Sequence, residues 1–260
     1  MVVVPITSER LGNTRSLRIY LPRGYHDAAN AQQRYPVLIM NDGFAVFSAR
    51  SWNAPARVDS AIAAGFVAPF ILVGIDNAAS IPGTTNPGQA RTNEFLPYPD
   101  RLEPAVPNPR GSTYAEFVVH EVMPLLGQRF RASNDRSDIG IGGSSYGGTA
   151  ALYTYLRFPD RFGKLLIEST LLSMFEGRLV DQMKAASILP DRLYFGVGTK
   201  ETEDAVIVAQ AASSGDAFVQ FATERLGNRF WFNRVEGGTH TSAAWGARFP
   251  AALHFLFPAN

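Results

Sequence analysis

Short apolar runs alternate with longer amphipathic segments along most of the chain, and this alternation restricts the fold more than any other feature of the sequence. The runs Tyr35–Asn41 and Phe70–Asp76 are almost wholly apolar, which is typical of strands that a sheet buries on both faces. Val2–Thr7 and Thr14–Leu21 flank a Gly-Asn pair that favours a turn between antiparallel strands. Four more strands are expected at Asp138–Gly142, Lys164–Glu168, Leu193–Val197 and Arg229–Val235.

Helical periodicity fills the intervals between these strands. The expected helices span about Ala54–Ala64, Thr113–Phe130, Tyr146–Phe158, Asp204–Leu226 and Ser242–Phe257. About eight strands with helical crossovers after the third predict an α/β fold: a mostly parallel sheet with an antiparallel start and helices on both faces. No linker or repeat divides the sequence, so residues 1–260 are expected to form a single domain.

The composition excludes several kinds of function. The chain has 260 residues and no cysteine, which rules out a cysteine nucleophile and a thiolate metal site. The net charge is +1 and the basic residues are scattered, so neither nucleic acid nor an acidic membrane surface is indicated as a partner. The longest apolar stretch, Ala61–Ile75, is too short to cross a bilayer. The first ten residues show no secretory signal, and the compartment stays open between the cytoplasm and secretion after processing.

The segment from Asn77 to Ser112 breaks the alternation. It is rich in proline and has no clear helical or strand period. It directly follows a predicted parallel strand, and loops in that position lie at the carboxyl edge of a sheet, where ligands bind. We therefore interpret residues 77–112 as a loop that faces the substrate, against the alternative of a passive surface insertion.

The pentapeptide Gly143-Ser-Ser-Tyr-Gly147 carries the strongest chemical signal. It fits the pattern G-x-S-x-G with Ser145 at its centre, between a predicted strand and a predicted helix, which is the context of a nucleophile elbow. Glycine is needed there because strand and helix approach closely, and the N–H of Tyr146 at the helix start would face a developing oxyanion. Ser144 is the alternative nucleophile, in the frame that starts at Gly142.

The base is expected to follow the nucleophile in the chain, which leaves two histidines. His240 lies in a loop after the last predicted strand, whereas His254 lies within the predicted C-terminal helix, where a packing or surface role is more common. The acid is expected after the penultimate strand, in the segment GTKETED. Glu201 is nearest the strand end, while Glu203 and Asp204 fall where the next helix begins and where acids also favour the helix dipole.

These motifs resemble the putative-esterase (esterase D) family of α/β-hydrolases, which includes feruloyl esterases, siderophore trilactone esterases, S-formylglutathione hydrolases and mycolyltransferases. The similarity extends over most of the chain. It rests on RSLRIYLPRGY (15–25), YPVLIMNDGFAVF (35–47), IGGSSYGG (141–148), FPDRFGKLLIES (158–169), GVGTKE (196–201) and GGTHTSAAW (237–245). The resemblance implies an α/β-hydrolase fold and serine esterase activity, and it favours Glu201 as the acid.

The resemblance also implies the second half of an oxyanion hole. After the Asp-Gly pair of the third strand's loop, the N–H of Phe44 would join that of Tyr146, with Asp42 orienting the loop and Gly43 giving the backbone room. The chain departs from the family at ESTLLSMF, where Ser-Pro-Ser and tryptophans are frequent, at Thr239 before the histidine, and in having Glu where feruloyl members often have Asp. The departures concern the substrate class more than the catalytic steps.

The segment RTNEFLPYP (91–99) resembles the siderophore-esterase side of the family, which makes Arg91 a candidate substrate-binding residue. The alternative interpretation is an Arg91–Glu94 ion pair that ties down the long loop. Aromatic residues also gather in the segments predicted to surround the site, and about half are expected to be ordinary core. The candidate aromatic contacts are Phe44, Phe47, Trp52, Phe95, Tyr98, Tyr146 and Trp245.

Together these features predict a serine carboxylic-ester hydrolase for short-chain or aryl and hydroxycinnamoyl esters, working without metal or organic cofactor on a small-molecule substrate. The alternatives are an acyltransferase with the same triad, a siderophore trilactone esterase, and a non-catalytic binding protein on a hydrolase fold. The natural ester and the oligomeric state are left open.

Overall fold

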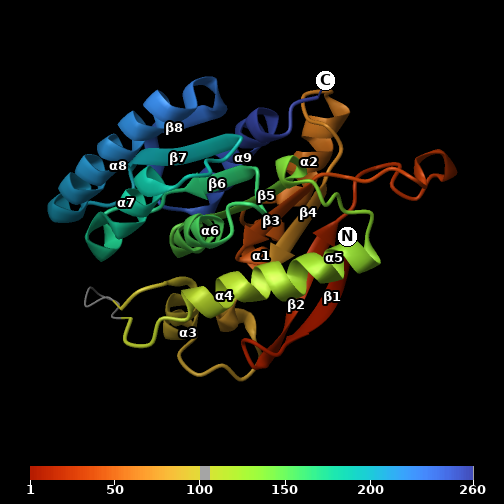
Figure 1. The fold of residues 1–260 in the computed structure, drawn as a ribbon, viewed down its shortest axis with the longest axis horizontal. Coiled ribbons are helices and arrows are strands. Elements are labelled where there is room, and N and C mark those ends of the chain that lie inside the picture. The colour runs from red at the N-terminus through yellow and green to blue at the C-terminus, as the bar shows by residue number, and fades with distance from the viewer. Residues whose placement is uncertain (100–105, 260) are drawn as a thin grey trace.

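The computed structural model describes residues 1–99 and 106–259, and within them eight strands form one sheet (Figure 1). The spatial order is β1-β2-β4-β3-β5-β6-β7-β8; β2 pairs antiparallel with β1 and β4, and the remaining neighbours are parallel. The expected sheet, mostly parallel with an antiparallel start, is confirmed. The strands are β1 (Val2–Ser8), β2 (Asn13–Tyr20), β3 (Val37–Asn41), β4 (Ile71–Ile75), β5 (Ile139–Ser144), β6 (Lys164–Glu168), β7 (Arg192–Lys200) and β8 (Phe230–Thr239).

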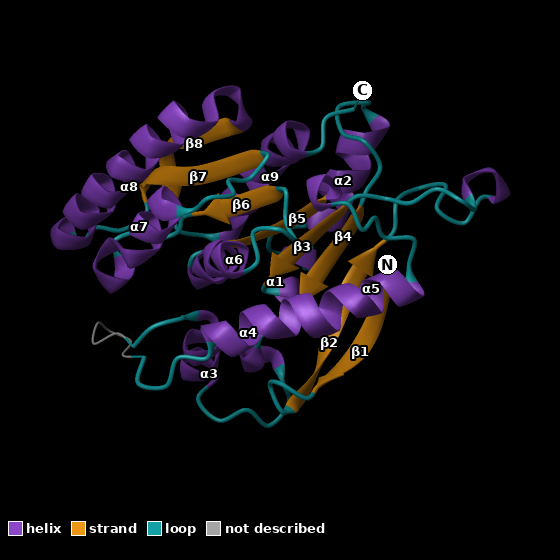
Figure 2. Cartoon of the chain, viewed as in Figure 1, coloured by secondary structure: helices purple, strands orange, loops and turns teal. Residues whose placement is uncertain are grey.

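Helices cover both faces of this sheet, as Figure 2 shows in purple around the orange strands. The α-helices are α1 (Gly43–Phe47), α2 (Ala54–Ala63), α3 (Pro87–Phe95), α4 (Gly111–Phe117), α5 (Met123–Arg129), α6 (Tyr146–Arg157), α7 (Arg178–Ala185), α8 (Ala205–Leu226) and α9 (Ser242–Leu256). A π-helical turn, Val118–Val122, joins α4 to α5, so the single helix expected over this region is continuous. Short 3₁₀ turns lie at Ala28–Asn30, Ala78–Ser80, Arg136–Asp138, Met174–Gly177 and Gly227–Arg229.

The central strands separate two apolar cores. In β3, Val37 and Ile39 face the core formed with α4, α5, α6 and α7, while Leu38 and Met40 face the core formed with α1, α2 and α9. Because successive side chains of a strand point to opposite faces, a strand buried on both faces must be apolar at every position. The continuous apolar runs in the sequence are explained by this double burial. No helix in the described part of the chain is long and apolar enough to span a membrane.

The proline-rich segment contains more regular structure than its sequence pattern predicts. Helix α3 begins after Asn86, whose side chain accepts a hydrogen bond from the N–H of Gln89, and Pro87 occupies the first turn, where its missing N–H costs nothing. The interpretation of 77–112 as a loop without regular structure is therefore wrong for residues 87–95, and also for 111–112, where α4 begins. Residues 100–105 of that prediction lie outside the described residues.

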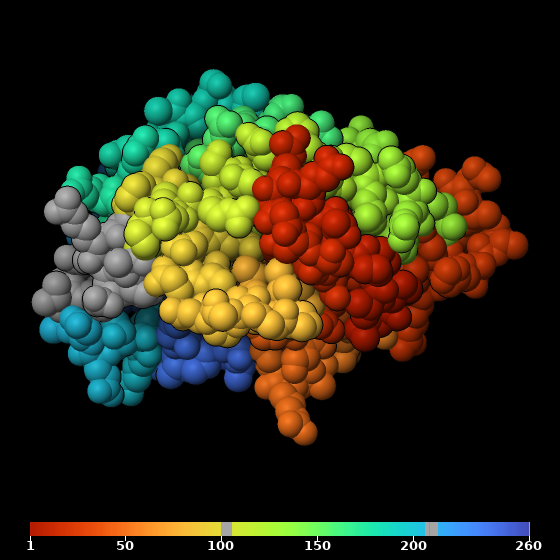
Figure 3. Space-filling model, turned by 90° about the horizontal axis from the view of Figure 1, so that it is seen from below, coloured from red at the N-terminus to blue at the C-terminus, as the bar shows by residue number. Residues whose placement is uncertain are grey.

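A buried ion pair attaches α3 to the antiparallel part of the sheet. Arg15 of β2 donates to both carboxylate oxygens of Glu94, at 2.5 and 2.9 Å, and the two side chains are 0% and 4% exposed. Arg15 also donates to the carbonyl of Asp76 and lies over the ring of Phe117. The β1–β2 hairpin (red) and the segment that carries α3 (yellow-orange) therefore lie side by side on one surface, as Figure 3 shows.

Replacing Glu94 with Gln leaves the Arg15 guanidinium buried without its counter-charge. We expect Glu94→Gln to lower the free energy of unfolding by about 3–5 kcal/mol in a urea titration. Glu116→Gln is the matched control, because its partner Arg10 and Glu116 are both more than a third exposed, and we expect a change below about 1 kcal/mol. Equal losses in the two variants would contradict a structural role for the buried pair.

Candidate active site

Ser145 occupies a sharp turn between β5 and α6. Its backbone angles are φ 53° and ψ −129°, a conformation that costs energy for any residue with a side chain and that clusters at functional sites. The N–H of Ser145 donates to the carbonyl of Glu168, and its own carbonyl accepts from Gly148 and Thr149. The surrounding backbone thus holds the serine in its strained conformation.

Two glycines make this turn sterically feasible. A Cβ atom on Gly143 would overlap the carbonyl of Gly147, and a Cβ atom on Gly147 would lie 2.7 Å from Oδ2 of Asp42. Ser144, the alternative nucleophile, is the last residue of β5, pairs with Glu168 of β6 and is buried. Ser145 is partly exposed, so the geometry favours Ser145 over Ser144.

The predicted acid and base meet across the last two strands. Lys200 of β7 pairs with Thr239 of β8, so the residues that follow them, Glu201 and His240, leave the sheet side by side. Oε2 of Glu201 lies 2.8 Å from Nδ1 of His240. Because the carboxylate can only accept, Nδ1 carries the proton, and Nε2 of a neutral His240 is left as an acceptor.

The other oxygen of Glu201 is held by two further donors. Oε1 accepts hydrogen bonds from the N–H of Gly198 at 2.6 Å and from the hydroxyl of Ser169 at 2.7 Å. Burial raises the pKa of Glu201, but the hydrogen bonds from His240, Ser169 and Gly198 outweigh it and hold that pKa below its ordinary value. Glu201 is therefore ionised at neutral pH, as an acid that orients a histidine must be.

The competing candidates lie elsewhere. Glu203 and Asp204 are exposed, and Glu201 is the carboxylate that contacts His240. His254 lies on α9, where the centroid of its ring is 5.8 Å from that of the exposed Phe66. Within the described residues no hydrogen bond joins Ser145 to His240; such contacts are often long in a free enzyme and tighten in the substrate complex. The end of β6 connects the Ser145 turn to the Glu201–His240 pair. The carbonyl of Glu168 accepts from the N–H of Ser145, and the next residue, Ser169, donates to Glu201.

The expected oxyanion loop is fastened to the elbow. Asn41, the last residue of β3, donates from its side chain to the carbonyl of Gly147 at 2.6 Å and accepts from the hydroxyl of Tyr114. Phe44 and Tyr146 occupy the first turns of α1 and α6, where backbone N–H groups point out of the end of the helix. The Asn41 side chain therefore connects the segment that carries Phe44 to the segment that carries Tyr146.

Arg91 supports this loop rather than pairing with Glu94. Its guanidinium donates to both oxygens of Asp42, at 2.8 and 2.7 Å, and it lies over the ring of Tyr146. The side chain of Asn77 donates to the same carboxylate. The expected Arg91–Glu94 pair is wrong, because Glu94 is occupied by Arg15 and the tertiary contact displaces the local one.

Three of the candidate aromatic residues belong to the core. Trp52 and Phe95 are 1% and 0% exposed, and Phe47 packs against Gly74 under the sheet. Trp52 and Phe95 have almost no accessible surface, which corrects their assignment as binding residues, and Phe47 is only 9% exposed. The remaining aromatic side chains are at least partly accessible; they are Phe44, Tyr98, Tyr146 and Trp245. Tyr98 packs against Tyr153 and Phe175, whereas Trp245 contacts the His240 ring.

Sequence reasoning missed Ser169 and Arg248. Ser169 directly follows β6, at the carboxyl edge of the sheet, and this position was the available signal. Arg248 lies inside α9 and reaches Ser169 and Glu168 only through the tertiary fold.

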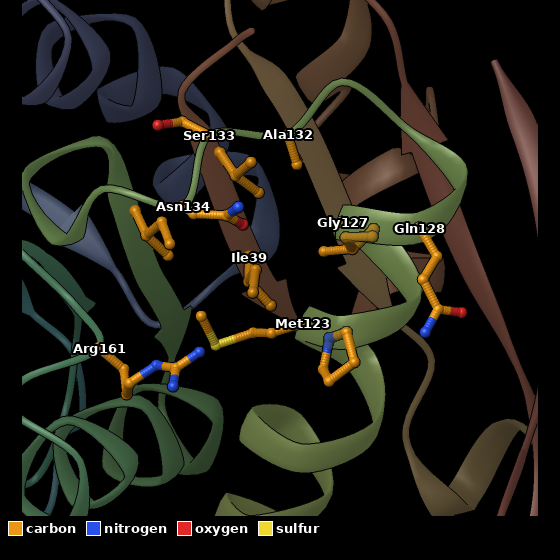
Figure 4. A pocket seen from close by; sticks show the side chains of 12 residues that line it. Ile39, Met123, Gly127, Gln128, Ala132, Ser133, Asn134 and Arg161 are labelled. Atoms are coloured by element: carbon orange, nitrogen blue, oxygen red, sulfur yellow. The ribbon is translucent and has the colours of Figure 1, made fainter.

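A cavity of about 310 Å³ lies at the other end of the sheet, near the starts of β3 and β5, with Ile39, Met123 and Arg161 around it (Figure 4). It is separate from the cluster of Ser145, Glu201 and His240.

Removing the Arg91 guanidinium should loosen Asp42 and with it the N–H of Phe44. Asp42 itself has a positive φ of 59°, so the loop depends on its side-chain contacts to keep this conformation. We expect Arg91→Met to lower kcat for ester hydrolysis by about 100-fold, with a smaller change in KM. Arg10→Met, which removes an exposed ion pair, is the control. A rise in KM alone would instead indicate that Arg91 binds substrate.

Comparison with known proteins places this geometry in a family. Residues 8–256 match the family described as "Putative esterase". The uncharacterized protein YbbA of Bacillus subtilis is 20% identical and aligns over 97% of this chain and 96% of its own length. An enterobactin esterase structure from Shigella flexneri superposes with a TM-score of 0.73 at 22% identity, over 98% of this chain and 58% of that one.

A structure described as ferulic acid esterase has the same TM-score, 0.73, at 19% identity, and covers 98% of this chain and 97% of its own. At these identities the structural likeness shows the shared fold, which is the expected α/β-hydrolase fold. The family match extends over nearly the whole sequence and confirms the resemblance seen in the motifs. The chain belongs to the putative esterase family of α/β-hydrolases.

Proposed function

We propose that this ester hydrolase is a serine carboxylic-ester hydrolase in which Ser145 is the nucleophile, His240 the general base and Glu201 the acid of the triad. The observation that carries the proposal is the 2.8 Å hydrogen bond between an ionised Glu201 and Nδ1 of His240. This bond fixes the imidazole tautomer whose Nε2 can accept a proton from a serine hydroxyl. The strained turn at Ser145 supports the same assignment.

The reaction then proceeds in two halves. Ser145 Oγ attacks the ester carbonyl carbon while His240 Nε2 takes the hydroxyl proton, and the tetrahedral oxyanion accepts hydrogen bonds from the N–H groups of Phe44 and Tyr146. Collapse of this intermediate breaks the bond to the leaving oxygen, to which His240 returns the proton. Water, deprotonated by His240, attacks the acyl-enzyme, and the acid leaves as Ser145 recovers its proton.

The accessible aromatic side chains favour a short or flat acyl group. Phe44 is 42% exposed beside the proposed oxyanion hole, and Trp245 meets the His240 ring edge-on with centroids 5.0 Å apart. Apolar walls with a few polar groups are typical of small-molecule pockets, and flat aromatic faces suit aryl groups. The similar structures described as enterobactin esterase and ferulic acid esterase support substrates of the aryl or hydroxycinnamoyl class.

A fluorophosphonate probe and a hydrolysis assay together test the triad. Ser145→Ala should abolish labelling and lower kcat by about 10⁶-fold, because loss of the nucleophile removes the covalent step. Ser144→Ala is the matched control and should keep both labelling and turnover. Retention of the wild-type rate by Ser145→Ala would overturn the mechanism.

The same assay ranks the acids. Glu201→Gln should cost about 10⁴-fold in kcat, because it leaves nucleophile and base in place but no longer stabilises the imidazolium. Glu203→Gln and Asp204→Asn are the comparison variants, and a loss confined to Asp204→Asn would transfer the role to that residue.

Substrate preference is tested with butyrate, ferulate and palmitate esters. We expect kcat/KM to be highest for the butyrate or ferulate ester, because short or flat acyl groups fit between the aromatic side chains. The products are analysed as well: free acid supports hydrolysis, whereas transfer to an added alcohol as the main reaction contradicts it. Highest efficiency on the palmitate ester would overturn the assigned substrate class.

A further inference from the structure

Ser169 lies beside the acid of the proposed triad, where its hydroxyl contacts three other side chains. It directly follows β6, is 6% exposed and has a φ of 47°, which is unfavourable for a residue with a side chain. Its hydroxyl is 2.7 Å from Oε1 of Glu201, 2.7 Å from Nε1 of Trp245 and 3.2 Å from Nη2 of Arg248. One buried oxygen thus contacts the acid and two other side chains.

The chemistry of these partners fixes the direction of the serine proton. The indole of Trp245 and the guanidinium of Arg248 are donors that cannot accept a hydrogen bond. A hydroxyl has one proton and two lone pairs, so the two donors occupy the lone pairs of Ser169 Oγ. The remaining proton has one acceptor within reach, which is Oε1 of Glu201.

Arg248 is itself held in place. Its Nε and Nη2 donate to Oε2 of Glu168 at 2.9 and 2.7 Å, and the two side chains are almost completely buried. Nη2 also lies 4.0 Å from Oε1 of Glu201. Because Glu168 orients the guanidinium, the donor that directs the Ser169 hydroxyl comes from a rigid part of the core.

The contacts to Glu201 also determine which oxygen faces His240. With Oε1 of Glu201 occupied by Ser169 and by the N–H of Gly198, the carboxylate cannot rotate without breaking two hydrogen bonds, and Oε2 is presented to Nδ1 of His240. Hydrogen bonds to a charged group are the stronger ones and so resist such a rotation. Trp245 contributes at both ends, because the indole that donates to Ser169 also packs against the His240 ring.

We propose that Ser169 is a positioning residue for the triad acid: its hydroxyl, directed by Trp245 and Arg248, holds the Glu201 carboxylate in the orientation that serves His240. This inference rests on the proposed serine mechanism and adds to it a hydroxyl whose partners are Glu201, Trp245 and Arg248.

Two substitutions at Ser169 separate the hydroxyl from the backbone conformation. Ser169→Ala removes the hydroxyl, and Ser169→Gly removes it while suiting a φ of 47°. We expect both to lower kcat by about 10- to 100-fold with little change in KM, because a hydrogen bond to a charged group is lost while the substrate contacts remain. Ser60→Ala, an exposed serine of α2, is the matched control and should keep the wild-type kcat.

The decisive measurement repeats Ser169→Ala in a Glu201→Gln background. A positioning role acts through the carboxylate, so the second substitution should change kcat by no more than about twofold once the carboxylate is gone. Trp245→Phe, which keeps an aromatic ring but removes the donor, should lower kcat by a larger factor in the wild type than in Ser169→Ala, because in the second case the hydroxyl that it directs is already gone. A merely structural role would cost the same factor in every background and would overturn the proposal.

The outcomes distinguish a failure of the role assigned to Ser169 from a failure of the proposed serine mechanism. Full kcat in Ser169→Ala and Ser169→Gly, with activity lost in Ser145→Ala and His240→Ala, would overturn the role of Ser169 and leave the proposed function standing. Loss of kcat in Ser169→Ala with recovery in Ser169→Gly would assign the effect to backbone strain and also overturn it. Wild-type rates in Ser145→Ala would overturn the mechanism and the inference together.

Discussion

The backbones of β5 and α6 approach each other at Gly143 and Gly147 with no room for a side chain, and the rest of the site is arranged around this contact. The close approach forces Ser145 into its strained turn. It also brings the carbonyl of Gly147 within reach of Asn41 and places the carboxylate of Asp42 against Gly147. The proposed nucleophile and the proposed oxyanion loop therefore share one support, and neither could shift alone.

Carboxylate–guanidinium pairs connect the loops of the site to the sheet. Arg15–Glu94 holds α3 against β2, Arg91–Asp42 connects α3 to the proposed oxyanion loop, and Arg248–Glu168 attaches α9 to the end of β6. Buried pairs of this kind add little stability compared with apolar packing, but a two-pronged guanidinium contact defines geometry well. The charged residues of the carboxyl edge thus determine where its loops lie, while the apolar cores below supply the stability.

The strands and the triad candidates could be predicted from the sequence because each rests on a local signal. A strand buried on both faces must be apolar throughout, and the elbow needs glycines at fixed spacing around Ser145. Helix α3 could not be predicted from the hydrophobic pattern, because its buried face includes Thr92 and Glu94 rather than an apolar stripe. The partners of Arg91 and Ser169 are set by tertiary contacts. Composition likewise cannot tell a core tryptophan such as Trp52 from an accessible one such as Trp245.

The pairing of β7 with β8 has a consequence for how the acid and base come together. β8 lies at one edge of the described sheet, and the two strands pass so close at Gly198 and Gly238 that a side chain on Gly198 would overlap the opposing backbone. A slip of one residue would turn every side chain of an edge strand to the opposite face. The register of the two strands shifts between Gly198 and Lys200, where Gly198 and Gly238 are in contact, and after this shift Lys200 pairs with Thr239. The irregularity therefore determines that His240 leaves the edge strand beside Glu201, rather than two residues out of step with it.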